Sequence, residues 1–237
     1  MTSKYLYGTD PECFIMNAKT GQFVSAAGII PGTKHLPFKV DRGAVQVDGL
    51  AAEFNIDPVN NEDDFDRNIQ TVLNQLITMV KDVDANLELV FTPTAHFDSD
   101  YFSSLDNETK ILGCDPDFNI KGEINGVSGD LSDTPIRTAA GHVHIGWRSP
   151  VPVTGDSDHF EDCRMVSEKF HTKKLKWFEP ETPAEKVRLH YYGHSGAFRP
   201  KTYGVELRSP SNRWVKESSS RREMFRTMDT FMHEIVG

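Results

Sequence analysis

Side chains that could do chemistry recur at every second position in four short, strand-like segments of this sequence. Alternate residues of a β-strand point to opposite faces, so each segment has one apolar face and one face that carries these side chains. The segments lie near the N-terminus, at 50–56, at 142–147 and at 203–208. Their polar faces carry Asp10 and Glu12, Glu53 and Asn55, His142 and His144, and Glu206 and Arg208.

A solvated outer face explains any one of these alternations, and for a single strand that is the better interpretation. Outer faces, however, favour Lys, Thr, Glu and Gln, whereas these four combine carboxylates, two histidines and an arginine with nearby glycines. Together they indicate a concave, charged site where backbone and ligand approach closely. Carboxylate oxygens with few nitrogens suit Mg²⁺ or Mn²⁺, ions that bridge phosphate oxygens during phosphoryl transfer. Arg208 is suited to a bidentate grip on phosphate or carboxylate.

The elements that must position these side chains are indicated by local patterns. Residues 4–16 predict a strand with a kink at Pro11, and Asp48-Gly49 predicts a hairpin turn between strands at 43–48 and 50–56. Asn61 is a strong N-cap for a helix whose first turn is acidic and whose apolar residues, Ile77 among them, follow at helical spacing. We also expect strands at 22–26, 86–92, 142–147 and 203–208, helices near 158–172, 182–192 and about 218–235, and a loop-rich segment at 107–140.

Bulk composition narrows the function classes. The 237 residues carry a formal net charge of -9, which argues against a general nucleic-acid binder but not against ATP. The sequence has three cysteines, an odd number, and no CxxC motif, so neither a disulfide framework nor a zinc ribbon is indicated. The sequence shows no signal peptide and no long apolar stretch, so we expect a cytoplasmic protein with no membrane partner.

Seven runs, taken in order, resemble the bacteriophage-encoded carboxylate–amine ligases of the glutamine synthetase/glutamate–cysteine ligase superfamily. They are DPECF, GIIPGTK, GAVQVDGLAAEFNI, GCDPDF, GHVHIGW, YYGHSGAFRPK and YGVELRSPSNRW, and they extend over about residues 5 to 215. The resemblance implies one α+β domain over residues 1–237, with a glutamine synthetase-like curved antiparallel sheet around an active-site funnel and helices packed on its outer face. It also implies a reaction in which ATP phosphorylates a carboxylate and an amine then displaces phosphate to form an amide.

The resemblance assigns roles to individual residues. Mg²⁺, or Mn²⁺ in its place, would be held by Asp10, Glu12 and Glu53, with Glu206 and His144 as further ligands. His142 would lie near the metal or the ATP phosphates, and Arg208 would stabilise the phosphoryl group during its transfer. Arg199 and Lys201, in the run FRPK, would contact anions. Two departures from the family pattern are Asp10-Pro-Glu in place of Glu-x-Glu and an unusual segment at 171–186 that could alter substrate specificity.

Several other residues have competing interpretations. Lys34 could bind phosphate or a substrate carboxylate, or could be an exposed loop lysine, and its run lacks the spacing of a P-loop. Asp48 fits the hairpin turn but could assist a metal. The simpler interpretations predict a solvated or ion-paired Arg188, turn-forming Asp115 and Asp117, an inert Cys114 and a solvated helix start at 218–222.

Two rival functions remain open. His142 and His144 with a glutamate could form a two-histidine, one-carboxylate site for Fe²⁺ or Zn²⁺, as in metal-dependent oxygenases and hydrolases. The chain could also be a non-catalytic phage accessory protein that keeps the ligase fold as a binding module. The favoured ligase reading implies a small-molecule or peptide carboxylate and an amine as substrates, in the host cytoplasm, and leaves a homo-oligomer open.

Overall fold

The computed structural model describes residues 2–110, 117–125, 134–147 and 158–236, and Cys114 and Asp115 lie outside these ranges. The elements are β1 (Tyr5–Thr9), β2 (Glu12–Asn17), β3 (Gln22–Val24), β4 (Phe38–Val40), β5 (Gly43–Asp48), β6 (Ala51–Ile56), α1 (Glu62–Val83), β7 (Leu87–Val90), β8 (Thr94–His96), α2 (Ser99–Ser104), α3 (Asn107–Lys110), β9 (Ile136–Thr138), β10 (Val143–Trp147), α4 (His159–Thr172), α5 (Pro183–Arg188), β11 (Phe198–Lys201), β12 (Gly204–Leu207), the 3₁₀ turn η1 (Asn212–Trp214) and α6 (Ser218–Val236).

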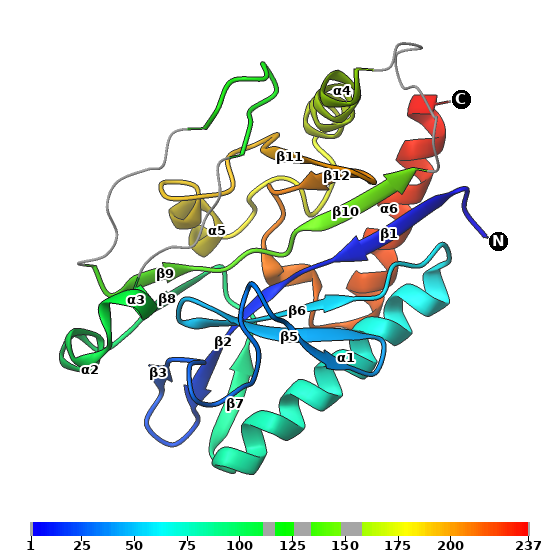
Figure 1. Ribbon diagram of the computed structural model, residues 1–237. Coiled ribbons are helices and arrows are strands. Elements are labelled where there is room, and N and C mark those ends of the chain that lie inside the picture. Colours follow the sequence, from blue (N-terminus) through cyan, green and yellow to red (C-terminus); the bar gives the residue numbers. More distant parts are fainter. Residues whose placement is uncertain (1, 111–116, 126–133, 148–157, 237) are drawn as a thin grey trace.

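The strands form a curled, antiparallel half-barrel (Figure 1). One part has the strand order β1-β10-β12-β11, and the other has the order β3-β2-β6-β5-β4 with β7 also paired to β2. A separate pair, β8 and β9, lies beside α2 and α3. The mixed α/β class with a curved antiparallel sheet, which the sequence predicts, is therefore correct at this level.

The kink at Pro11 joins the two parts of the half-barrel. Before it, β1 pairs with β10, and after it, β2 pairs with β6. Proline has no backbone N–H for a ladder, and the Pro11 carbonyl instead accepts a hydrogen bond from the Phe54 N–H. Asp10, immediately before the kink, consequently lies at the junction between the two parts, where their polar faces meet.

The predicted hairpin and first helix are both present. Gly49 has a φ of 56°, which suits glycine, and it connects β5 to β6. Asn61 caps α1 by accepting a hydrogen bond from the Asp64 N–H at 2.9 Å. The apolar side of α1 covers the apolar faces of β5 and β6, and the opposite, polar faces of these strands line the pocket described below. Ile77, expected to be inward, is instead 42% exposed.

Helix α6 lies beside α1 along the convex side of the sheet, and α4 packs on β11 and β12 (Figure 1). Phe225, Met228 and Met232 are buried as expected, and Ile235 packs at the edge of the core. The helix start at 218–222 is not simply solvated, which corrects the prediction. Arg221 is buried and its Nε lies 2.6 Å from a carboxylate oxygen of Asp66 on α1, so it ties the two helices together.

Other differences concern short elements. The helix expected at 182–192 ends at Arg188, after a capping box between Thr182 and Glu185. Strand β11, which the sequence analysis missed, carries Arg199 and Lys201 along the edge of the sheet next to β12. The segment 107–140, expected to be loop-rich, contains α3 and β9 within its described part.

Candidate functional site

A single cavity of about 540 Å³ collects the polar faces of both parts of the half-barrel. It is lined by residues of β1, β2, β5, β6, β10 and β11, by the positions just before β10 and just after β12, and by the loop that carries Lys34. Every residue that the sequence analysis selected for the site lies on its wall except Glu206, which is fully buried behind it. The selected residues on the wall are Asp10, Glu12, Lys34, Glu53, His142, His144, Arg199, Lys201 and Arg208.

One wall of the cavity is acidic. Glu12 and Glu53 are directly opposite each other in the β2–β6 ladder, and Asp48 lies near both. Glu12 accepts a hydrogen bond from the Ala140 N–H at 3.0 Å, and Glu53 accepts one from the Gln46 side chain at 2.7 Å. Burial, with repulsion from Asp48, raises the pKa of Glu12 to about 8. Burial and repulsion from Asp10 likewise raise the pKa of Glu53 well above its usual range. At Glu12 and Glu53, burial and repulsion between the acids therefore outweigh the contacts that favour the charged forms.

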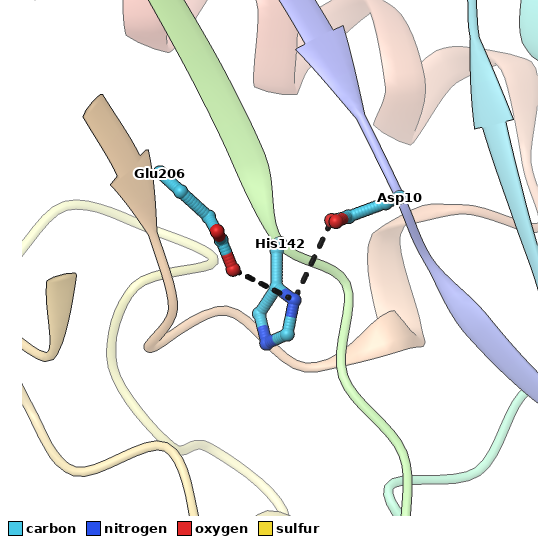
Figure 2. Close-up of side chains that lie close together, drawn as sticks. All are labelled: Asp10, His142 and Glu206. Carbon is cyan, nitrogen blue, oxygen red and sulfur yellow. Dashed lines mark ion pairs between the residues drawn. The ribbon is translucent and has the colours of Figure 1, made fainter. Parts of the chain in front are cut away.

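Both histidines lie beside Asp10 at the junction of the two parts, and Figure 2 shows this contact for His142. The Asp10 Oδ1 lies 3.4 Å from Nδ1 of His142 and 3.0 Å from Nε2 of His144. Burial alone would raise the pKa of Asp10, but the charge and hydrogen bonds of the two imidazoles outweigh it and hold this pKa well below its usual range. Burial, together with the nearby Arg208 cation, lowers the pKa of His142 to about 3. For His144 burial acts in the same direction, but Asp10 outweighs it and the pKa is raised.

The outer nitrogens of both imidazoles contact tyrosine hydroxyls. The Tyr192 hydroxyl lies 3.1 Å from Nε2 of His142, and the Tyr203 hydroxyl lies 2.6 Å from Nδ1 of His144. Burial raises the pKa of Tyr203, so its hydroxyl keeps its proton at neutral pH. Each ring is therefore held between a tyrosine on one side and the Asp10 carboxylate on the other.

The opposite wall is cationic and is organised by the buried Glu206. The Glu206 Oε2 lies 2.8 Å from Nζ of Lys201 and 3.3 Å from Nη1 of Arg199, and its Oε1 contacts Nη1 of Arg208. Arg208 is also paired through Nε, at 3.0 Å, with Asp117. Glu206 therefore forms ion pairs with three cationic side chains, and these contacts fix the positions of the three charged groups.

The structure also offers one compact set of metal-ligand atoms. Within the described ranges, Asp10, His142 and Glu206 are the one set of three such side chains whose ligand atoms all lie within 4.8 Å of one another (Figure 2). The Oε1 of Glu206 is 3.6 Å from Nδ1 of His142. This set differs from the predicted one, in which His144 is a ligand and His142 has a looser role.

Two simpler interpretations of the sequence are wrong. Arg188 is not solvated, since it is 1% exposed and donates to two main-chain carbonyl groups behind the site. Asp117 is not merely a turn residue, because it is buried against Arg208. Neither contact can be predicted from neighbouring residues in the sequence, because the partners are 20 or more positions apart along the chain.

Among the residues of the cavity wall that sequence reasoning missed are Gln46, Tyr192 and Tyr203. Gln46 could have been found, because it alternates with Val45 and Val47 in the same way as the selected residues. Tyr192 belongs to no alternating segment. Tyr203 begins the segment 203–208, but it alternates in step with the apolar Val205 and Leu207 and so was not selected. Lys34 is an exposed loop residue that lines the cavity, so its two interpretations both stay open.

Comparison with known proteins adds no family assignment: no family model matches this sequence, and no curated protein matches it significantly. In the described part of the chain, no helix combines the length and the apolar character needed to cross a bilayer.

Proposed function

We propose that this protein is an ATP- and Mg²⁺-dependent carboxylate–amine ligase with a glutamine synthetase-like fold. The observation that carries the proposal is the division of one cavity into an acidic wall and a cationic wall, about a central carboxylate with two imidazoles. Enzymes that transfer phosphoryl groups need both kinds of wall, since divalent metal and cationic side chains together balance the phosphates. The curved antiparallel sheet with helices on its convex side fits the same family.

The acidic wall fits a hard divalent cation. Glu12 and Glu53 are opposite each other with Asp48 nearby, and their raised pKa values reflect burial and mutual repulsion that a cation would relieve. We therefore assign Mg²⁺ to Glu12, Glu53 and Asp48. A bound Mg²⁺ would neutralise charge on the phosphate oxygens and orient them for in-line transfer.

The cationic wall fits the transferred phosphoryl group. Arg199, Lys201 and Arg208 all point their charged ends at Glu206, which holds them in place before a ligand arrives. Such prepositioned donors stabilise developing negative charge without reorganising at the moment of reaction. In this proposal Glu206 positions cations, which revises its predicted role as a metal ligand.

The proposed reaction has two steps, phosphorylation of the carboxylate and attack by the amine. The substrate carboxylate attacks the γ-phosphorus of ATP, a P–O bond to ADP breaks, and an acyl phosphate forms. The amine nitrogen then attacks the acyl carbon, the C–O bond to phosphate breaks, and the departing phosphate takes up the proton that the amine loses. Tyr203, hydrogen-bonded to His144 on the wall, and Lys34, at the loop, lie where they could orient the amine and the carboxylate. The substrates are a small-molecule or peptide carboxylate and an amine.

The test is calorimetric titration of a non-hydrolysable ATP analogue, with and without Mg²⁺, into wild type and Glu53→Gln. We expect Mg²⁺-dependent binding to the wild type and a loss of that dependence in the variant, because an amide is a poor Mg²⁺ ligand. Glu88→Gln, at an exposed position on β7, is the matched control and should bind like the wild type. Absence of nucleotide binding to the wild type under any metal would refute the ligase proposal.

The compact set of Asp10, His142 and Glu206 favours a second candidate, a hydrolase or oxygenase that depends on Zn²⁺ or Fe²⁺. Against it, Glu206 is already neutralised by three cations, and both imidazoles share one carboxylate. Elemental analysis of the purified protein separates the two candidates, since stoichiometric zinc or iron that survives dialysis would favour the second.

A further inference from the structure

Arg188, the last residue of α5, is a buried arginine that the proposed reaction does not use. Its Nη1 donates to the Ser209 carbonyl at 2.9 Å, and its Nη2 donates to the Arg208 carbonyl at 3.1 Å. The planar guanidinium thus donates hydrogen bonds to two successive carbonyl groups of the chain just after β12. These hydrogen bonds fix the main chain from which the Arg208 side chain enters the site.

The same guanidinium lies beside the ring of Tyr192. The ring centroid is 5.3 Å from Cζ of Arg188 and 5.1 Å from Cζ of Arg208, so the ring contacts both cations. Gly193, the next residue, has a φ of 71°, and a Cβ there would lie 2.4 Å from the Arg188 guanidinium. A glycine at position 193 therefore allows both the positive φ of this turn and the close approach of the Arg188 guanidinium.

Tyr192 in turn fixes His142. Nδ1 of His142 faces carboxylate oxygens of Asp10 and Glu206, so the proton of the neutral ring belongs on this nitrogen. Nε2 is then an acceptor, and the Tyr192 O–H is positioned to donate to it over 3.1 Å. The hydroxyl thus defines the ring orientation on the side away from the carboxylates.

We propose that Arg188 and Tyr192 are positioning residues of the site: Arg188 holds the Arg208 main chain and the Tyr192 ring, and Tyr192 holds His142 in the Nδ1–H form that faces Asp10 and Glu206. The consequence for turnover rests on the ligase function proposed above. The consequence for the His142 ring follows from the contacts alone and is measurable without nucleotide.

The first measurement is nitrogen NMR of histidine side chains in protein labelled at histidine, with the His142 resonances assigned from the spectrum of His142→Gln. In the wild type we expect an Nδ1–H ring with a hydrogen-bonded Nε2. Tyr192→Phe should move the Nε2 resonance toward that of an unbonded nitrogen, and Arg188→Lys should move it in the same direction. Tyr191→Phe and the exposed Arg67→Lys are matched controls that should leave it in place. An Nε2 resonance unchanged in both test variants would overturn the proposal.

The second measurement is steady-state turnover with ATP. Displacement of positioned groups costs rate more than affinity, so we expect kcat to fall about ten- to a hundredfold in both test variants, with nucleotide affinity within about twofold. A role confined to stability would instead leave kcat unchanged in the folded fraction, and that result would overturn the proposal. If Arg188→Lys fails to fold, Tyr192→Phe, which keeps the ring, decides alone. If the wild type shows no ATP-dependent turnover, the ligase proposal fails and the NMR result decides the positioning roles.

Discussion

The carboxylates of the acidic wall should destabilise the metal-free protein, although we propose that the same groups bind Mg²⁺. Glu12 faces Glu53 across the β2–β6 ladder, and burial with repulsion from Asp48 raises the Glu12 pKa to about 8. We predict that Glu12→Gln stabilises the metal-free protein at neutral pH while it removes stabilisation by Mg²⁺. An amide keeps the shape of the side chain and can still accept from the Ala140 N–H, but it carries no charge.

The magnitude follows from proton linkage. In the unfolded chain Glu12 ionises near its ordinary value of 4.5, whereas in the folded protein it stays protonated until pH approaches about 8. The folded-state pKa is raised, so stability is fully present below pH 4.5 and is lost as pH rises toward 8. At pH 7 the loss is about 3 kcal/mol, since each pKa unit corresponds to about 1.36 kcal/mol. This order-of-magnitude figure is the largest gain that Glu12→Gln can give at pH 7, and the gain grows further as pH rises to 8.

The assay is urea unfolding at pH 5, 7 and 8, in EDTA and in excess Mg²⁺. In EDTA the variant should gain on the wild type as pH rises, by up to about 3 kcal/mol at pH 7, and the difference should be small at pH 5. Mg²⁺ should stabilise the wild type by mass action but not the variant. Glu88→Gln, at an exposed position, controls for the general loss of one negative charge. A variant that is less stable than the wild type in EDTA at pH 8 would refute the reasoning.

Two further predictions concern buried arginines. Arg208→Lys should lower ATP-dependent turnover about a hundredfold or more in single-turnover assays, because lysine cannot serve Glu206 and Asp117 together, and turnover within a few-fold of wild type would contradict this. Asp66→Asn should cost about 2 kcal/mol at pH 7 in urea unfolding, because Asp66 pairs with the buried Arg221 at 2.6 Å. Burial acts to raise the Asp66 pKa, but hydrogen bonds from Ser218 and Arg221 outweigh it, so the pKa is lowered. The cost should therefore shrink as pH falls below 3.8, and a constant cost down to pH 2 would argue against this pairing.

Much of the fold was predictable because its signals are local. The N-cap at Asn61, the turn at Asp48-Gly49 and the kink at Pro11 each depend on neighbouring residues, and all three are confirmed. Strand β11 was missed because Pro200 interrupts it and because some of the contacts that hold it come from distant residues, such as Phe118, which pairs with Phe198. The exposed Ile77 was misjudged for a similar reason, since helical spacing defines a face but not how far the sheet beneath it extends.

The burial of three arginines was the least predictable feature of the structure. Arg188, Arg208 and Arg221 are all buried, and each depends on partners far away in the chain: main-chain carbonyls near 208, Asp117 and Asp66. An arginine in a sequence is usually exposed, and nothing adjacent to these three indicates otherwise. Burial follows only once the fold supplies enough acceptors to satisfy the guanidinium.

Glu206 illustrates what the alternating pattern can and cannot establish. Its position opposite Val205 and Leu207 correctly directs it toward the polar side of β12. Whether it holds a metal or balances cations depends on its neighbours across the sheet, and these are His144 on β10 and Arg199 on β11. Register therefore divides the acids of this site: Glu12 and Glu53 face each other across one ladder, whereas Glu206 faces a cationic side chain across another. Alternation within one strand can identify reactive side chains, but their roles follow from the pairing between strands.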